Sequence, residues 1–275
     1  MNDADLSRQL LDIAVRAATE AGDYILEPFH HGVTAEEKAG NYDLVTEYDR
    51  NSERMIAARI FRSFPDSTLV GEEGGNQGDG GVHWYVDPID GTNNFADGLP
   101  FFCVSIAAAA HGQMLAGAIF DPLRRELFTA SVDGAFLNGK PIHSHGHATD
   151  AKAVVVTGCP SSGGRAIPAE YDLFRRLVDT CHSVRRLGCT ALELAYVACG
   201  RADVSFGLRT NPWDVAAASF LLRQAGGQYL GIRTTEPPGD LRPWHCRTFI
   251  GACADFALDE SLVWQVRGRG EVVSW

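Results

Sequence analysis

The chain has 275 residues, of which 45% are hydrophobic and 21% charged, so it can bury a core of its own and does not belong to the disordered class. Its length suits one large domain or two closely packed halves. The formal net charge is −11 and no run of Lys and Arg exceeds two residues, whereas nucleic-acid-binding proteins normally carry a basic face, so we expect no nucleic-acid partner.

The N-terminal part of the chain predicts two helices. Residues 5–29 place apolar side chains at helical spacing. A second helix is expected to begin near Thr46, a suitable N-cap with Asp49 in the first turn, and to end at Phe64, which precedes Pro65.

From about residue 69 the pattern changes to short apolar strands separated by turn residues. We expect strands at 68–70, 84–86, 102–109, 114–120, 127–131 and 135–137. His111-Gly112 and Asn138-Gly139 mark two of the turns. This half is therefore predicted to be mostly antiparallel.

The second half alternates between the two kinds of element. We expect strands at 154–156, 184–187, 202–206, 228–232 and 248–252. Helices are expected at 169–181, 190–199, 214–225 and 255–266. Because no flexible linker interrupts the pattern, it predicts a single α+β layered sandwich of two packed halves, about 1–145 and 146–275.

The cysteines and the N-terminus predict a location in the cell. Seven cysteines are an odd number, and no pair has the C-x-x-C spacing of a zinc or redox site. No basic segment followed by an apolar one begins the chain, so no secretory signal is expected. The most apolar run, 101–110, is too short to span a bilayer. These features predict a reducing, cytoplasmic location and no membrane partner.

The segment Asp87-Pro88-Ile89-Asp90-Gly91-Thr92 is the most informative motif. An apolar strand delivers two aspartates into a tight turn, where Pro88 fixes φ and Gly91 permits an unusual backbone conformation. Carboxylates this close repel one another unless a cation lies between them. Hard oxygen ligands of this kind suit Mg²⁺.

An isolated pair of this spacing is more often an ordinary turn. Two other acidic positions favour a site instead. Glu72 and Glu73 also follow an apolar strand, and Asp214 begins a helix among apolar residues. Strand ends and helix starts are where sites collect in layered folds.

Several blocks together resemble the inositol monophosphatase family of lithium-sensitive, metal-dependent phosphatases, over about residues 11–263. They are Lys38, Asp43-Leu44-Val45-Thr46 with Asp49, Asp87-Pro88-Ile89-Asp90-Gly91-Thr92, Trp213-Asp214-Val215-Ala216-Ala217 and Ala225-Gly226-Gly227. The resemblance implies a five-layer αβαβα sandwich with the site between its halves, a homodimer, and hydrolysis of a small phosphorylated metabolite by a metal-activated water without a covalent phosphoenzyme.

The resemblance also implies a set of oxygen ligands for two or three Mg²⁺ ions. These are Glu72, Asp87, the Ile89 carbonyl and Thr92 for the first, Asp87, Asp90 and Asp214 for the second, and Glu72 with Glu73 for the third. Glu72 and Thr92 would orient and deprotonate the water, with Asp49 hydrogen-bonded to Thr92. Lys38 and Asp43 would support the ligands without binding the ions.

The same resemblance implies substrate contacts around the metals and along the pocket. They are Asp90, Gly91, Thr92, Asp214, Gly188, Thr190, Arg209 and Ser161. Backbone N–H groups of Gly91 and Thr92 would face the phosphate at a helix N-terminus.

The identity of the substrate stays open. Inositol-specific members carry a glutamate seven residues before the second-signature aspartate, where this chain has Gly207. An inositol-1-phosphate-like monoester is the first expectation. Asn211-Pro212-Trp213-Asp214 also resembles relatives that act on histidinol phosphate, and the family includes adenosine 3′,5′-bisphosphate nucleotidases. A non-catalytic regulatory relative is the remaining alternative.

Overall fold

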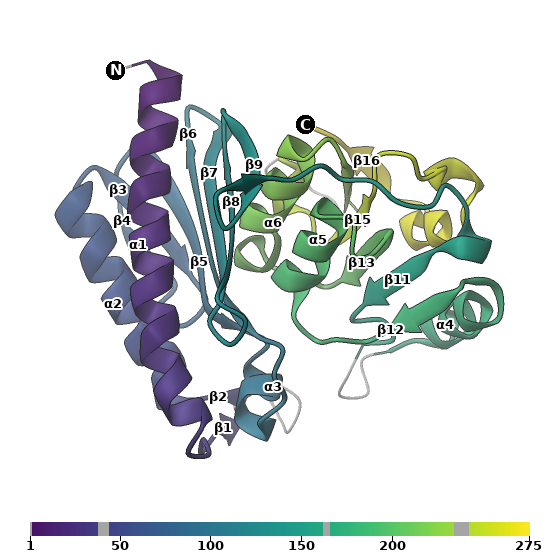
Figure 1. Ribbon diagram of the computed structural model, residues 1–275, viewed down its shortest axis with the longest axis horizontal. Coiled ribbons are helices and arrows are strands. Elements are labelled where there is room, and N and C mark those ends of the chain that lie inside the picture. The colour runs from purple at the N-terminus through teal and green to yellow at the C-terminus, as the bar shows by residue number, and fades with distance from the viewer. Residues whose placement is uncertain (1, 38–43, 162–165, 234–241) are drawn as a thin grey trace.

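The computed structural model describes residues 2–37, 44–161, 166–233 and 242–275. Its two main sheets and their helices form five layers in the order helices, sheet, helices, sheet, helices (Figure 1). The predicted α+β layered sandwich is therefore confirmed. None of the helices in these ranges is long and apolar enough to cross a membrane.

The first sheet has eight strands and is antiparallel except where β3 pairs with β5. Its spatial order is β10 (Lys140–Pro141), β9 (Gly134–Leu137), β8 (Glu126–Ser131), β7 (Gln113–Asp121), β6 (Cys103–Ala110), β5 (Val82–Asp90), β3 (Ser67–Gly71) and β4 (Asn76–Gly78). A separate two-stranded ribbon joins β1 (Glu36–Glu37) to β2 (Leu44–Val45). The mostly antiparallel character predicted for this half is present.

Two helices, α1 (Asp3–Phe29) and α2 (Glu47–Ser63), cover the outer face of this sheet (Figure 1). α2 begins as expected: Thr46 is its N-cap, and Thr46 and Asp49 exchange hydrogen bonds in a capping box. This capping box fixes the direction of the Asp49 side chain independently of the other residues of the site.

The second sheet has six strands, in the order β12 (Ser183–Arg185), β11 (Val154–Thr157), β13 (Val204–Leu208), β15 (Thr248–Ala252), β14 (Gln228–Arg233) and β16 (Glu271–Val273). Helices α5 (Thr190–Ala198) and α6 (Pro212–Gln224) lie between the two sheets, and α4 (Pro168–Thr180) and η4 (Leu262–Arg267) cover the outer face. The remaining short helices are α3 (Thr92–Asp97), η1 (Asp150–Lys152), η2 (Pro243–His245) and η3 (Leu258–Glu260).

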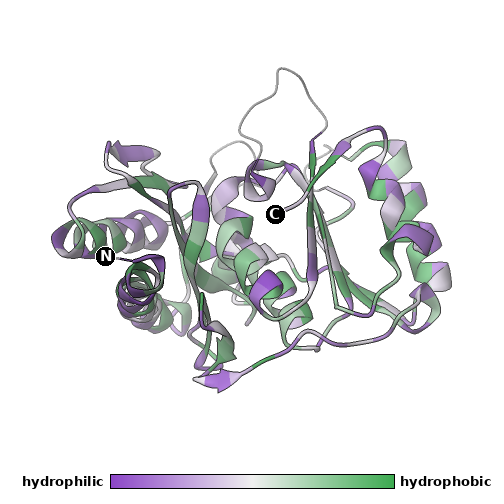
Figure 2. Cartoon of the chain, turned by 90° about the horizontal axis from the view of Figure 1, so that it is seen from above, coloured by the Kyte–Doolittle hydropathy of each residue, from purple (hydrophilic) through white to green (hydrophobic). Residues whose placement is uncertain are grey.

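The central layers account for the long apolar runs of the sequence. β6 packs between α1 and α6, and each of its residues is buried, as expected for a strand covered on both faces. Residues 215–222 of α6 are also all buried, so this helix has no solvent face over that length. The view from above shows hydrophobic residues concentrated where the layers meet (Figure 2).

One predicted element was wrong. Residues 255–266 were expected to form an α-helix, but the structure has two 3₁₀ segments, η3 and η4, there. Asp150 accepts hydrogen bonds from the Leu262 amide at 2.8 Å and the Ser261 hydroxyl at 2.5 Å, and Ser261 accepts the Val263 amide at 3.0 Å. These side-chain bonds take the donors that a continuous helix would use, so the helical path restarts at this point.

Gly22 sets how closely α1 approaches the first sheet. A Cβ atom at this position would lie 2.4 Å from Cδ1 of the buried Phe120 ring. We expect Gly22→Ala to lower the free energy of unfolding by about 1–3 kcal/mol, despite the better helix propensity of alanine, because the ring cannot move away. Urea unfolding measures this, with exposed Gln9→Ala of the same helix as the control. Equal midpoints for the two variants would contradict the packing argument.

Candidate metal centre and active site

The parallel pairing of β3 and β5 brings two acidic residues together. Gly71, the last residue of β3, pairs with Val86 of β5, so the next residues along the two strands, Glu72 and Asp87, lie side by side. The Glu72 amide donates to the Val86 carbonyl oxygen at 3.3 Å. Two positions 15 residues apart in the sequence therefore meet because of sheet register.

A bulge in β5 places the second aspartate of the motif. Asp87 lies opposite Ser105 of β6 and Asp90 opposite Cys103, so β5 holds one extra residue between the two pairs. Pro88 is tolerated there because a bulge leaves one residue without its ladder hydrogen bond. Asp87 and Asp90 are 3% and 8% exposed. Carboxylates so deeply buried need compensation by hydrogen bonds or a cation.

Asp90 reaches across to the other half of the molecule. Its carboxylate accepts the backbone N–H groups of Thr190 at 3.2 Å and Ala191 at 2.5 Å, in the first turn of α5, and the thiol of Cys189 at 3.3 Å. A carboxylate at the start of a helix is stabilised by the unpaired amides and by the helix dipole. Asp90 is thus part of the docking between the first sheet and α5.

Asp214 enters the site from α6. Pro212 begins this helix, and the carboxylate of Asp214 accepts the Asn211 amide at 2.8 Å. This bond folds the side chain back over the start of the helix and fixes its direction.

The pKa shifts show that four carboxylates share one environment. Burial raises the pKa of Asp87 well above its usual value, and the charges of Glu72, Asp90 and Asp214 raise it further. Burial also raises the pKa of Asp214, as do Asp90 and Glu72. The pKa of Asp90 is raised to about 6 by burial, against the lowering effect of its bonds to Ala191, Cys189 and Thr190. Acidic groups that disfavour one another's ionisation in this way fit a divalent cation, which would remove the repulsion.

Asp49 and Thr92 form the expected contact beside this cluster. The Thr92 hydroxyl lies 3.1 Å from the Asp49 carboxylate and 2.9 Å from the Ile89 carbonyl oxygen. Burial raises the pKa of Asp49, its bonds with Thr46 lower it, and the charge of Glu73 raises it. Glu73 therefore lies on the Asp49 side of the site.

Glu53 is a structural part of the site that the sequence analysis missed. Its buried carboxylate accepts the amides of Glu73 at 2.8 Å and Gly74 at 2.6 Å, and so holds the turn that carries Glu72. The spacing could have revealed it, because Glu53 follows Asp49 by four residues and therefore lies on the same face of α2.

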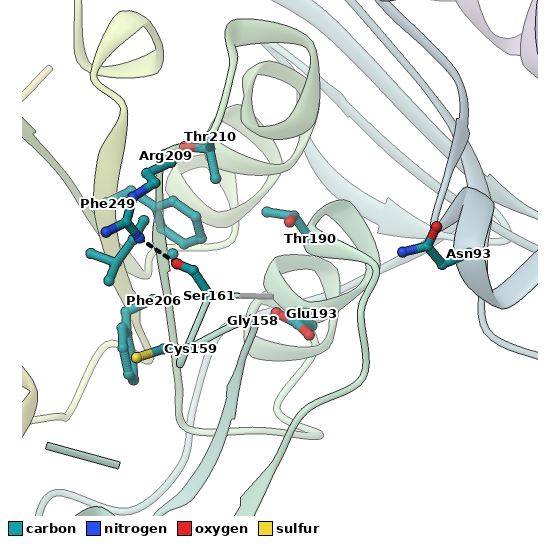
Figure 3. Close-up of a pocket in the computed structure, with 12 residues that line it drawn as sticks. Asn93, Gly158, Cys159, Ser161, Thr190, Glu193, Phe206, Arg209, Thr210 and Phe249 are labelled. Atoms are coloured by element: carbon teal, nitrogen blue, oxygen red, sulfur yellow. Dashed lines mark hydrogen bonds between the residues drawn. The ribbon is translucent and has the colours of Figure 1, made fainter. Parts of the chain in front are cut away.

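A pocket of about 230 Å³ lies at the start of α5, where Asp90 is bound, and is lined by Asn93 of α3, Thr190 and Glu193 of α5, residues 158, 159 and 161 after β11, and residues 206–210 and 249 (Figure 3). The expected substrate residues Ser161 and Arg209 both line it, but they contact each other. Arg209 also forms an ion pair with the buried Glu170 at 2.6 Å. Its charge is therefore balanced within the protein, a point that the sequence did not predict.

Of the two positions expected to contact the substrate near the start of α5, Thr190 is among the residues that line this pocket and Gly188 is not. Thr190 lines the pocket and its amide bonds Asp90, whereas the Gly188 amide donates to Glu193 at 3.1 Å. Gly188 has φ of 75° and Gly91 has φ of 93°, in the left-handed region that glycine tolerates best. Lys38 and Asp43 lie outside the described residues.

Comparison with known proteins gives the family. A family model described as "Inositol monophosphatase family" matches residues 6–265. The chain belongs to the inositol monophosphatase family. It is 40% identical over 223 residues to a protein named Nus factor SuhB from Escherichia coli K12, which covers 79% of this chain and 83% of the relative. It is 37% identical over 251 residues to Nus factor SuhB from Xylella fastidiosa, which covers 90% and 91%.

A solved structure supports the same family assignment. An IMPase from Thermotoga maritima is similar with a TM-score of 0.79 and 32% identity, over 93% of this chain and 96% of that chain. The resemblance inferred from the sequence motifs is thus confirmed. The inositol monophosphatase family is generally Mg²⁺-dependent, and the four clustered carboxylates supply the hard oxygen donors that Mg²⁺ prefers.

Metal-free protein should lose stability as the pH rises. Burial raises the folded-state pKa of Asp90 from 3.8 to about 6, so the stability that its protonated form contributes is present below about pH 4 and is lost as pH rises through about 6. The contribution is at most about 3 kcal/mol. We expect the melting temperature in EDTA to fall more steeply from pH 5 to pH 8 in wild type than in Asp90→Asn, and Mg²⁺ to restore it in wild type at pH 8.

The Asp90→Asn comparison is necessary because of His245. Burial lowers the pKa of His245 to about 4, so that residue favours the folded state at higher pH and acts in the opposite direction. Both proteins contain His245, so its contribution cancels in their difference, which reports Asp90 together with its effect on the pKa values of Asp87 and Asp214. Parallel pH profiles for the two proteins would contradict the assignment.

Gly207 is closed to the glutamate that inositol-specific relatives carry. A Cβ atom at this position would lie 2.4 Å from Cε1 of the buried Phe249 ring. We expect Gly207→Glu to reduce the free energy of unfolding by about 1–3 kcal/mol and to give no gain in inositol-1-phosphate turnover. Gly158→Glu is the control, because Gly158 lines the same pocket with nothing within 4 Å of its Cβ position. A stable Gly207→Glu protein that gains turnover would show that the Phe249 ring moves aside, and would contradict the packing argument.

Proposed function

We propose that this chain is a Mg²⁺-dependent phosphatase that hydrolyses a small phosphate monoester by activating a water molecule. The observation that carries this proposal is the convergence of Glu72, Asp87, Asp90 and Asp214, which come from two neighbouring strands of the first sheet and from helix α6. A phosphate monoester repels nucleophiles by its own negative charge, so a site for its hydrolysis must concentrate cations. An acidic cluster of this kind does so by holding metal ions.

The ligand assignments follow the family pattern. Glu72, Asp87, the Ile89 carbonyl and Thr92 would hold one Mg²⁺ ion, Asp87, Asp90 and Asp214 would hold a second, and Glu73 would contribute to a third. Bound Mg²⁺ supplies positive charge for the phosphate and lowers the pKa of a water ligand. The cluster is the part of the chain that makes such binding favourable, because the aspartates repel one another without it.

The remaining residues position the water and the phosphate. The Asp49 carboxylate accepts a hydrogen bond from the Thr92 hydroxyl, so the Thr92 oxygen is left to accept a hydrogen bond from the water. Glu72 takes a proton from that water as the base. Gly91 and Thr92 present backbone N–H groups to the phosphate at the first turn of α3, where no side chain caps the helix.

The substrate is proposed to be an inositol-1-phosphate-like monoester, with histidinol phosphate and adenosine 3′,5′-bisphosphate as the alternatives. Phosphate release from these three compounds, measured with and without Mg²⁺ and Li⁺, separates them. We expect Li⁺ to inhibit and the active species to be a homodimer, which light scattering under assay conditions checks.

A second function rests on the names of the relatives. Proteins 37% and 40% identical to this chain are named Nus factor SuhB, which favours a regulatory module that acts through a protein partner. Idle acidic clusters are costly when no cation fills them, so the four retained carboxylates favour the phosphatase. Metal binding without phosphate release from any monoester would instead support the module.

Asp90→Asn tests the proposed site directly. The change removes one negative charge from the cluster while keeping the shape of the side chain. We expect turnover of the best monoester to fall on the order of 10³-fold, with the fold retained by circular dichroism. Asp133→Asn is the control, because Asp133 pairs with Arg8 on the surface. Asp90→Asn activity within a few-fold of wild type would rule out this role for Asp90.

A further inference from the structure

A second cavity lies at the opposite end of α6 from the carboxylate cluster, and we call it the α6 cavity. Its volume is about 520 Å³, compared with about 230 Å³ for the pocket at the start of α5, and the two share no lining residue. Its walls come mainly from the last turn of α6, the turn between β6 and β7, η2 and residues 274–275. From Asp214 to Arg223 the helix rises about 14 Å, so the α6 cavity is separate from the proposed metal centre. Cavities of this volume hold small organic ligands in many proteins.

Two tryptophans in the wall of the α6 cavity have buried N–H groups without an acceptor. Trp244 is 1% exposed, and its ring centroid lies 4.7 Å from that of Trp275. Within the described ranges, neither Nε1 atom has a hydrogen-bond partner. The N–H group of a buried tryptophan normally finds a partner, because a buried donor without one is destabilising. The two donors therefore indicate an acceptor that the chain itself does not supply.

Two arginines give the α6 cavity positive charge. The guanidinium carbon of Arg223 lies 4.8 Å from the centre of the Trp275 ring, and that of Arg242 lies 5.4 Å from the centre of the Trp244 ring. Among the described residues that line the cavity, none is acidic. Across the part of the chain that the structure describes, Arg223 has no ion pair and donates no hydrogen bond. Its contact with a ring leaves its N–H donors available to an anion.

The end of α6 does not cancel this charge. The C-terminal end of a helix carries partial negative charge on its unpaired carbonyl oxygens. In α6 the carbonyl oxygens of Leu221, Leu222 and Arg223 already accept the amides of residues 225, 227 and 226. The Arg223 side chain also adds its positive charge in the last turn. An anion in the α6 cavity therefore meets cations and N–H donors.

We propose that the α6 cavity binds a small organic anion with an aromatic body. The ring of this ligand packs against Trp244 and Trp275, and its negative charge lies near Arg223 and Arg242. The indole N–H groups supply further donors to its oxygen atoms. This binding site is outside the proposed metal centre and does not depend on the proposed phosphatase function.

A pair of probes of the same shape tests the ligand class. Naphthalene-1-carboxylate has the aromatic body and the charge, whereas 1-naphthylmethanol has the same rings without the charge. We expect calorimetric titration of the full chain to show one carboxylate bound per chain, with the alcohol at least about tenfold weaker. The affinity of the carboxylate should be the same in Mg²⁺ and in EDTA, because the α6 cavity lies away from the metal centre.

Arg223→Met locates the bound anion. Methionine keeps an apolar side chain of similar length against Trp275 and removes the charge of this exposed residue. We expect the variant to bind the carboxylate about tenfold more weakly than wild type. Arg267→Met is the matched control, because Arg267 also lies over a tryptophan ring, that of Trp264 at 5.2 Å, but does not line the α6 cavity. The control should bind within about twofold of wild type.

Ser274→Glu provides a second test that does not depend on the Arg223 side chain. Ser274 is exposed and lines the α6 cavity, so a glutamate there opposes an anion without disturbing the core. We expect a loss of about tenfold in the affinity for the carboxylate.

Four outcomes would overturn the inference. The first is no saturable binding of the carboxylate up to about 10 mM, and the second is equal affinity for the alcohol. The third is binding that requires Mg²⁺, which would place the anion at the metal centre. The fourth is unchanged affinity in both Arg223→Met and Ser274→Glu, which would place it elsewhere on the protein.

Discussion

The structure depends on the docking of Asp90 against the first turn of α5. Asp90 ends a strand of the first sheet, and the amides that it accepts belong to a helix that packs against both sheets. The same carboxylate is a ligand of the proposed metal centre. Position and chemistry are therefore linked, because the hydrogen bonds that join the first sheet to α5 also fix both carboxylate oxygens of this proposed ligand.

Much of this site could be predicted because its parts are local. Two aspartates separated by Pro88 and Ile89 at the end of an apolar strand indicate a turn with converging oxygen atoms, whatever the fold. Thr46 and Asp49 are likewise a local pattern, and the capping box forms where the sequence indicates it. The layered class follows from elements whose periodicity is strong, such as the doubly covered strand β6.

What could not be predicted depends on contacts between distant segments. Glu53 and Glu193 look like ordinary members of helices, and only tertiary structure shows that one holds the turn of Glu72 and the other reaches a pocket. The sequence analysis expected Arg209 to contact the substrate. The structure instead pairs it with Glu170 of α4, a contact between distant segments. The helix predicted at 255–266 was wrong for the same reason. Asp150, which accepts the Leu262 amide, lies more than a hundred positions earlier in the sequence.

The complete burial of α6 restricts how a protein of this architecture can diversify. Residues 215–222 touch layers on every side, and Asp214 stands at the head of the same helix. A change of side-chain volume along this helix would displace Asp214, a ligand of the proposed centre. The sequence of the helix can therefore change very little. Thr190 at the start of α5 and residues 206–210 at the end of β13 line the pocket instead. New substrates are therefore most readily acquired by changes at the rim of the pocket, while the reaction itself stays the same.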